Sequence, residues 1–166
     1  TFDARAEIRR SALEVLFDIL DFHGERFSPG FWFEAYHKVL LPIFDRVRFD
    51  DENDEKQDEG EDSWVFHTTQ RCLDLLVDLT AKRRERILTS ENSRGKETLG
   101  ALFDLFVSLC LTSSKKLASC GVGAMHRLLS SNAADALDEH GWSVAVDALA
   151  RAMEATKPDV KSLNAI

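Results

Sequence analysis

Apolar residues recur at helical spacing through most of the 166-residue chain, starting within residues 3–20. In this stretch the apolar positions fall on or beside one stripe of a helix, and charged residues cover the rest. The predicted buried stripe is Ala12, Leu13, Val15, Leu16, Ile19 and Leu20. Asp3 can cap the first turn, Glu7 adds favourable negative charge there, and Gly24 can supply a left-handed C-cap. The pattern predicts an amphipathic first helix ending near Gly24.

Five further segments show the same period, and none shows the alternation typical of a strand. Ser28 and Pro29 mark the start of a second helix to about residue 48, and Pro42 predicts a kink near residues 39–41. The other helices are predicted at about residues 63–84, 97–111, 114–130 and 138–156. The chain is therefore predicted to be one all-α domain over residues 1–166.

A weak internal repeat refines this fold class. Residues 11–20 and 120–129 share a small residue, Ala12 or Gly121, followed by matching apolar positions, and each leads into a helix containing a tryptophan, Trp32 or Trp142. Repeated helical units with matching apolar positions are typical of stacked antiparallel helix pairs of the HEAT or armadillo type, because each pair buries its apolar face against its neighbours. We expect a segment of such an α-solenoid with about six helices, and a plain helical bundle is the alternative.

The negative charge of the chain is concentrated in one segment. Residues 50–62 hold nine acidic side chains and one lysine, and the remaining 20 acidic and 20 basic side chains cancel. A broad basic face for nucleic acid is therefore excluded. The segment has no apolar period, so it is predicted to be a solvated, disordered loop, and it lacks the spacing of an EF-hand calcium site.

No set of residues in the sequence has the spacing of an active site. Cys72, Cys110 and Cys120 each lie in an apolar helical pattern, which is typical of buried reduced thiols in an intracellular protein. His126 and Cys120 are six residues apart, a poor match on one helix, so an enzyme or metal protein using them is the weaker alternative. We predict no catalytic, cofactor-binding or metal-ligating residue, and no cofactor.

Two further features bear on location. No apolar run could span a bilayer and no signal peptide is recognisable, so we expect a soluble chain. Because it begins directly in a helix without an initiating methionine, we also expect it to be a piece of a longer protein. Four cations, Lys82, Arg83, Arg84 and Arg86, lie at the end of the third predicted helix. Favourable interaction with the C-terminus of that helix explains them, and contact with an anionic membrane or acidic partner is the alternative.

Several motifs together resemble a known family. They include the run LEVLFD at residues 13–18, LPIFD at residues 41–45 and VDL at residues 77–79. The residues that carry the resemblance are Asp3, Arg5, Glu7, Arg9, Phe17, Asp18, Gly24, Trp32, Asp45, Trp64, Arg127 and Trp142. The pattern resembles the large Arf guanine-nucleotide exchange factors of the brefeldin A-inhibited, trans-Golgi class, in the helical region that follows their catalytic exchange domain.

This resemblance implies a non-catalytic regulatory or scaffolding segment. The expected partners are small GTPases of the Arf or Rab type, or other regions of the same exchange factor. The expected location is the cytoplasm, peripheral to Golgi and trans-Golgi network membranes. The alternatives are a purely structural helical spacer and a peripheral membrane-binding domain.

Overall fold

The computed structural model of the protein describes residues 4–45, 64–88 and 93–155, and every regular element within them is helical. The α-helices are α1 (Ala4–His23), α2 (Pro29–Ala35), α4 (Trp64–Lys82), α5 (Arg84–Ile87), α6 (Ser93–Cys110), α7 (Lys115–Leu129) and α8 (Glu139–Ala155). Two 3₁₀ turns, η1 (Gly24–Arg26) and η3 (Asn132–Ala136), and a π-helical turn, η2 (Tyr36–Leu40), also occur, and residues 41–45 after η2 are again α-helical. The all-α prediction is confirmed, whereas the predicted loop at 50–62 lies outside the described residues.

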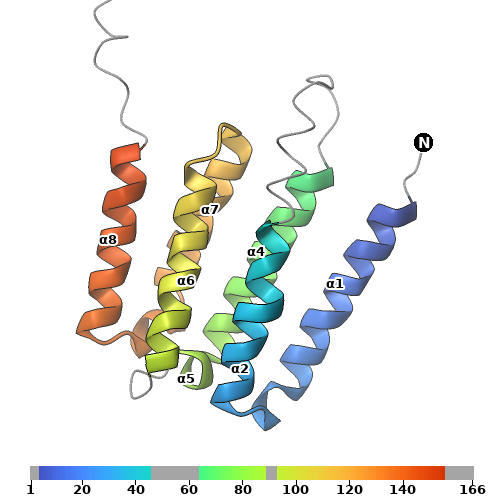
Figure 1. Cartoon of the computed structure of the whole chain (residues 1–166), viewed down its shortest axis with the longest axis horizontal. Coiled ribbons are helices and arrows are strands. Elements are labelled where there is room, and N and C mark those ends of the chain that lie inside the picture. Colours follow the sequence, from blue (N-terminus) through green and yellow to red (C-terminus); the bar gives the residue numbers. More distant parts are fainter. Residues whose placement is uncertain (1–3, 46–63, 89–92, 156–166) are drawn as a thin grey trace, which may run out of the picture.

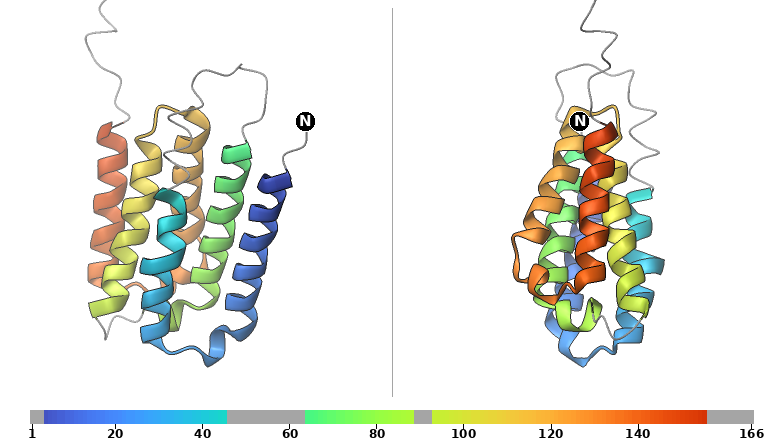
Figure 2. Two further views of the ribbon diagram at one scale, coloured as in Figure 1. Left: turned by 45° about the vertical axis from the view of Figure 1, so that its right-hand side comes forward. Right: turned by 90° about the vertical axis from the view of Figure 1, so that its left-hand side faces the viewer.

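The helices form two layers (Figures 1 and 2). α1, α4 and α7 lie side by side in one layer, and α2, α6 and α8 form the other. Polar pairs show that α1 and α4 run parallel, because Glu14 approaches Arg71 and, further along both helices, Asp21 binds Lys82 at 2.7 Å. This arrangement confirms the predicted solenoid-like stacking of helices.

The predicted repeat does not match in burial at the level of single residues. α1 and α7 lie in the same layer, on either side of α4. The pairing of Ala12 with Gly121 is nevertheless wrong as a packing equivalence, because Ala12 is exposed and Gly121 is buried. α4 and α6, which lie between α1 and α7 in the sequence, have no counterpart in the sequence match.

The buried side of α1 differs from the predicted stripe. Phe17 and Leu20 are in the core, while Val15 and Ile19 are 56% and 49% exposed. The reason is that α1 lies at the end of its layer and packs on α4 with one side only. The helix does end at His23, but Gly24 does not adopt the left-handed conformation expected of a C-cap.

The start of the second helix follows the prediction. The Ser28 hydroxyl accepts a hydrogen bond from the Phe31 N–H at 3.2 Å, and the ring of Phe27 packs edge-on against Trp32. Ahead of Pro42 the helix widens into η2, where the Leu41 N–H binds the Tyr36 carbonyl. Proline clashes with the carbonyl four residues before it, and the structure accommodates this with a widened turn beside the predicted position, after which the helix continues through residues 41–45.

Two other helix bounds differ from the prediction. The helix predicted to run to residue 84 ends at Lys82, and α5 follows as a separate turn after a break at Arg83. α6 begins at Ser93, four residues before the predicted start. Tertiary contacts of the basic residues, described below, account for the break at Arg83.

One polar contact crosses the core between η2 and α4. The Tyr36 hydroxyl lies 2.7 Å from the Thr80 hydroxyl, and the latter donates to the Leu76 carbonyl, also at 2.7 Å. A hydroxyl has one proton, so Tyr36 must donate to Thr80. Burial raises the pKa of Tyr36, which keeps this hydroxyl protonated.

Candidate functional site: the groove between α4 and α7

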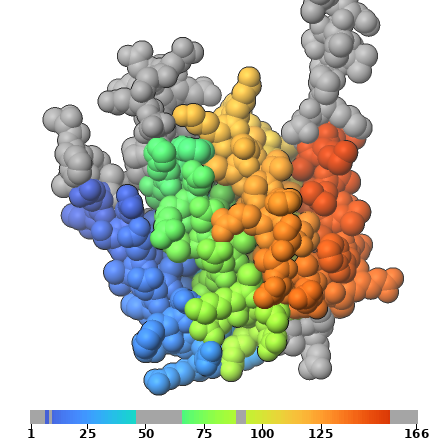
Figure 3. Space-filling model, turned by 180° about the vertical axis from the view of Figure 1, so that it is seen from behind, coloured from blue at the N-terminus to red at the C-terminus, as the bar shows by residue number. Residues whose placement is uncertain are grey.

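A groove of about 450 Å³ runs between the parallel helices α4 and α7 on the layer that also contains α1. Figure 3 views this face, where the three helices lie side by side. Its lining combines an apolar floor with charged walls. The lining residues are Phe66, Gln70, Leu73 and Asp74 from α4, and Lys115, Lys116, Ser119, Cys120, Gly123, Ala124 and Arg127 from α7.

One end of the groove is closed by an ion-pair clamp. The Arg127 guanidinium binds the Asp74 carboxylate and, through its other terminal nitrogen, Asp78 at 2.7 Å. Asp74 and Asp78 are four residues apart, so they face the same side of α4. The clamp fixes the register of α7 on α4, although its side chains are too exposed to contribute more than modestly to stability.

The other end of the groove is cationic. Lys115 and Lys116 lie in the first turn of α7, and the Lys116 ammonium stands 5.5 Å from the centre of the Phe66 ring. A cation over an aromatic face is attracted by the ring, and both groups stay partly exposed. A ligand in the groove would therefore meet apolar surface in the middle and positive charge at this end.

Gly123 keeps the middle of the groove open. A Cβ at this position would meet no atom within 4 Å, whereas one at Gly121 would lie 2.7 Å from the Phe106 carbonyl oxygen. Both glycines are expected from the sequence to allow close helix packing. That expectation is correct for Gly121 and wrong for Gly123, which lines a space.

The thiols have the environment of structural cysteines. Burial raises the pKa of Cys72 to about 11 and also raises the pKa of Cys110. Burial, followed by the nearby Asp74 carboxylate, raises the pKa of Cys120 in the groove. The reactive form of cysteine is the thiolate, so none of the three is activated as a nucleophile at neutral pH.

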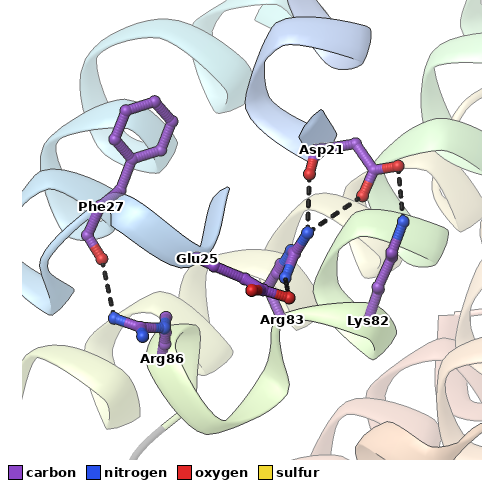
Figure 4. Close-up of polar contacts among 6 residues, drawn as sticks. All are labelled: Asp21, Glu25, Phe27, Lys82, Arg83 and Arg86. Atoms are coloured by element: carbon purple, nitrogen blue, oxygen red, sulfur yellow. Dashed lines mark hydrogen bonds and ion pairs between the residues drawn. The ribbon is translucent and has the colours of Figure 1, made fainter. Parts of the chain in front are cut away.

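The four predicted basic contacts are used largely within the fold (Figure 4). Arg83 is 11% exposed and reaches the end of α1, donating to the Asp21 carbonyl oxygen at 2.7 Å and to Glu25 at 3.0 Å. Lys82 binds the Asp21 carboxylate at 2.7 Å, and Arg86 donates to the Phe27 carbonyl oxygen at 3.1 Å. These cations hold α4 and α5 to the turn after α1.

Arg84 is the remaining member of the basic set. It approaches its neighbour Glu85 at 3.8 Å. Contact of these four residues with a membrane or an acidic partner remains a prediction.

The motif residues are dispersed over the fold. Phe17, Gly24 and Trp32 are buried, and a Cβ on Gly24 would come within 3.0 Å of the Trp32 ring. Glu7, Asp18, Asp45 and Trp142 are exposed, and the side chains of Asp3, Arg5, Arg9 and Trp64 lie outside the described residues. Of the motif residues whose side chains the structure describes, only Arg127 lines the groove.

Sequence reasoning missed the groove itself. The sequence feature that could have indicated it is the four-residue spacing of Asp74 and Asp78, which places two carboxylates on one side of α4. Within the described residues there is no cluster of three or more potential metal-ligating His, Cys, Asp or Glu side chains. Among the helices that the structure describes, none has the length and apolar character needed to cross a membrane.

Comparison with known proteins gives a consistent set of relatives. The chain is 35% identical over 168 residues to brefeldin A-inhibited guanine nucleotide-exchange protein 3 of Arabidopsis thaliana, and 36% identical over 173 residues to protein 2 of the same name and organism. Protein 1 of that series is 30% identical over 153 residues and covers 86% of this chain.

The first two relatives each cover 96% of the chain, but the chain spans 9% of the length of either relative. No family model and no solved structure matches the chain. The alignments confirm the resemblance predicted from the motifs.

Proposed function

The chain belongs, as one region, to the brefeldin A-inhibited class of guanine nucleotide-exchange proteins, and on this premise we propose that it is a non-catalytic regulatory segment that binds another protein. The parent protein would promote GDP release from an Arf GTPase during vesicle traffic at the Golgi. This segment would act from the cytoplasmic side, peripheral to Golgi and trans-Golgi network membranes, as a HEAT-like module.

The groove between α4 and α7 is the observation that carries the proposal. It offers an apolar floor with Leu73 and Ala124, an aromatic ring at Phe66, and cations at Lys115 and Lys116. An amphipathic helix or loop with apolar anchors and acidic flanks fits such a lining. The candidate partners are a GTP-loaded small GTPase of the Arf or Rab type and another region of the same exchange factor.

A matched pair of glycine substitutions tests this function. Gly123→Leu would place a large side chain in the groove, while Gly100→Leu makes the same change on α6, at a position outside the groove lining. A Cβ at either glycine meets no atom within 4 Å, so both variants are expected to fold. The complete exchange factor with each change is then titrated with GTP-loaded Arf and Rab proteins and assayed for exchange.

We expect Gly123→Leu to weaken binding of one partner or to alter exchange by at least about tenfold, equivalent to about 1.4 kcal/mol. Gly100→Leu should leave both unchanged. If Gly123→Leu also leaves partner binding and exchange unchanged, the segment is a spacer. A salt-sensitive affinity for anionic vesicles, lost when Lys82 and Arg84 are neutralised, would instead support the membrane-binding alternative.

A further inference from the structure

A second surface pocket lies on the other side of α4, between this helix and α1. Its volume is about 260 Å³, and its apolar lining consists of Leu13, Leu75 and the buried Cys72. Two arginines, Arg10 from α1 and Arg71 from α4, also line it. We call this opening the α1–α4 pocket. It has the same combination of apolar surface and cations as the groove between α4 and α7.

The two arginines of the α1–α4 pocket share one carboxylate. The Oε1 atom of Glu14 lies 3.3 Å from the Nε of Arg10 and 3.9 Å from the Nε of Arg71. Both arginine side chains are more than half exposed. The terminal nitrogens of a guanidinium can bind a carboxylate as a two-pronged pair, which is the strongest geometry for this contact. The pocket is therefore suited to a carboxylate ligand.

The charge of the two openings differs from that of the whole chain. Five cationic side chains and two carboxylates line the groove and the α1–α4 pocket, although the chain has a net charge of −8. The cations are Arg10, Arg71, Lys115, Lys116 and Arg127, and the carboxylates are Asp74 and Glu14. Both carboxylates are already paired with arginines of the fold. Charge complementarity therefore favours an acidic occupant.

Both openings flank the same stretch of α4. Gln70 lines the groove and the next residue, Arg71, lines the α1–α4 pocket. Figure 3 shows this face, on which α4 lies between α1 and α7. A helix with its side chains is about 10–12 Å across, so about four extended residues of a bound segment would reach from one opening to the other.

We propose that the α1–α4 pocket binds a carboxylate side chain of an acidic segment whose apolar residues occupy the groove. Glu14 holds the position of that carboxylate in the unbound protein, and the ligand replaces it between Arg10 and Arg71. The exchange of one carboxylate for another keeps both arginines paired. This inference rests on the proposed function, since it names the chemistry of the segment that binds the same face.

Removal of the internal carboxylate tests the proposal. Glu14→Gln keeps the size of the side chain but removes its charge. Glu34→Gln makes the same change on α2, in a carboxylate that pairs with Lys38 outside both linings. Arg71→Gln removes one cation of the pocket, and Arg151→Gln is its control, because Arg151 pairs with carboxylates of α6 and α8.

Each change is made in the complete exchange factor, which is titrated with a fluorescein-labelled amphipathic peptide of glutamate and leucine. Fluorescence anisotropy measures the affinity. We expect Glu14→Gln to tighten binding at least about threefold and Arg71→Gln to weaken it at least about fivefold, because both changes act on charged hydrogen bonds. Both controls should leave the affinity unchanged. Tighter binding cannot result from damage to the fold.

Gly123→Leu in the same titration separates this inference from the proposed function. If all three changes alter the affinity, one acidic segment occupies both openings. Weaker binding in Gly123→Leu without any effect of Glu14→Gln and Arg71→Gln would overturn the inference and leave the groove as the site. Effects of the α1–α4 pocket changes alone, or no binding of the peptide, would also overturn it, while the GTPase titrations above still decide the proposed function.

Discussion

At the scale of single residues, Gly121 and Gly123 are two glycines on one helix with different structural roles. A Cβ on Gly121 would lie 2.7 Å from a backbone oxygen of α6 and 2.9 Å from the Cys110 sulfur, while one on Gly123 would enter open space. The first glycine permits the contact between α6 and α7. The second leaves room in the groove at the expense of helix propensity.

Alanine substitutions should therefore have opposite effects on stability. We expect Gly121→Ala to lower the free energy of unfolding by about 1–3 kcal/mol, because the backbone of α6 must move. Gly123→Ala should raise it by about 0.5–1 kcal/mol, since alanine favours the helix and meets nothing. Urea unfolding followed by tryptophan fluorescence measures both, and a loss of stability in Gly123→Ala would contradict the open environment.

The buried hydroxyl of Tyr36 makes stability depend on high pH. Burial raises its pKa in the folded state, so the folded protein keeps the proton that the unfolded chain releases near its ordinary pKa of about 10. The contribution of Tyr36 is fully present below pH 10 and is lost progressively above it. Between pH 10 and 11 the free energy of unfolding should fall by about 1 kcal/mol more in the parent than in Tyr36→Phe.

Urea titrations at both pH values check this difference. Tyr36 is the one tyrosine in the sequence, so the absorbance of tyrosinate reports its ionisation directly. Cys72, whose pKa is also raised, contributes equally in parent and variant. Ionisation of Tyr36 near pH 10 in the folded protein would show that its hydroxyl is not held as the structure has it.

At the scale of elements, the break between α4 and α5 brings Arg83 to the end of α1. Its guanidinium donates to the Asp21 carbonyl and to Glu25 while being 11% exposed. Lys82, beside it, binds Asp21 from a position that is 57% exposed. The two neighbouring cations thus join the same helices with different degrees of burial.

Arg83→Met should destabilise the protein by roughly 1.5–3 kcal/mol, because it removes charged hydrogen bonds and leaves the Asp21 carbonyl without this donor. Lys82→Met, the matched control, should cost less than about 1 kcal/mol and the loss should shrink with added salt. Urea unfolding at low and high salt measures both variants. Equal losses would mean that burial of Arg83 adds nothing to its contacts.

The positions of the helices could be predicted largely from the spacing of apolar residues, the capping residues and Pro42. Which side of each helix faces the core could not be predicted in this way. α1 carries apolar residues on two sides, Phe17 and Leu20 on one and Val15 and Ile19 on the other, and the pattern alone does not say which side meets α4. The partners of Arg83 are 58 and 62 residues away in sequence, so these contacts cannot be inferred from local spacing. The groove depends on the same kind of distant contact.

At the scale of the whole molecule, the two-layer arrangement makes stability position-dependent. α6 packs against α2, α7 and α8, while α1 packs mainly on α4 and its own following turn. In such an array each helix is held by its neighbours, so the end helices have the fewest supporting contacts. Large apolar side chains are accordingly exposed on both end helices, for example Val15 and Ile19 on α1 and Val146 and Leu149 on α8.

Hydrogen exchange of the 166-residue chain should therefore show a gradient along the layers. We expect amides of α1 and α8 to exchange at least about tenfold faster than those of α6, because they can open without breaking the centre. Mass spectrometry of peptides from the three helices measures this directly. Uniform protection would mean that the segment opens only as one cooperative unit, with the contacts of α1 and α8 as strong as those at the centre.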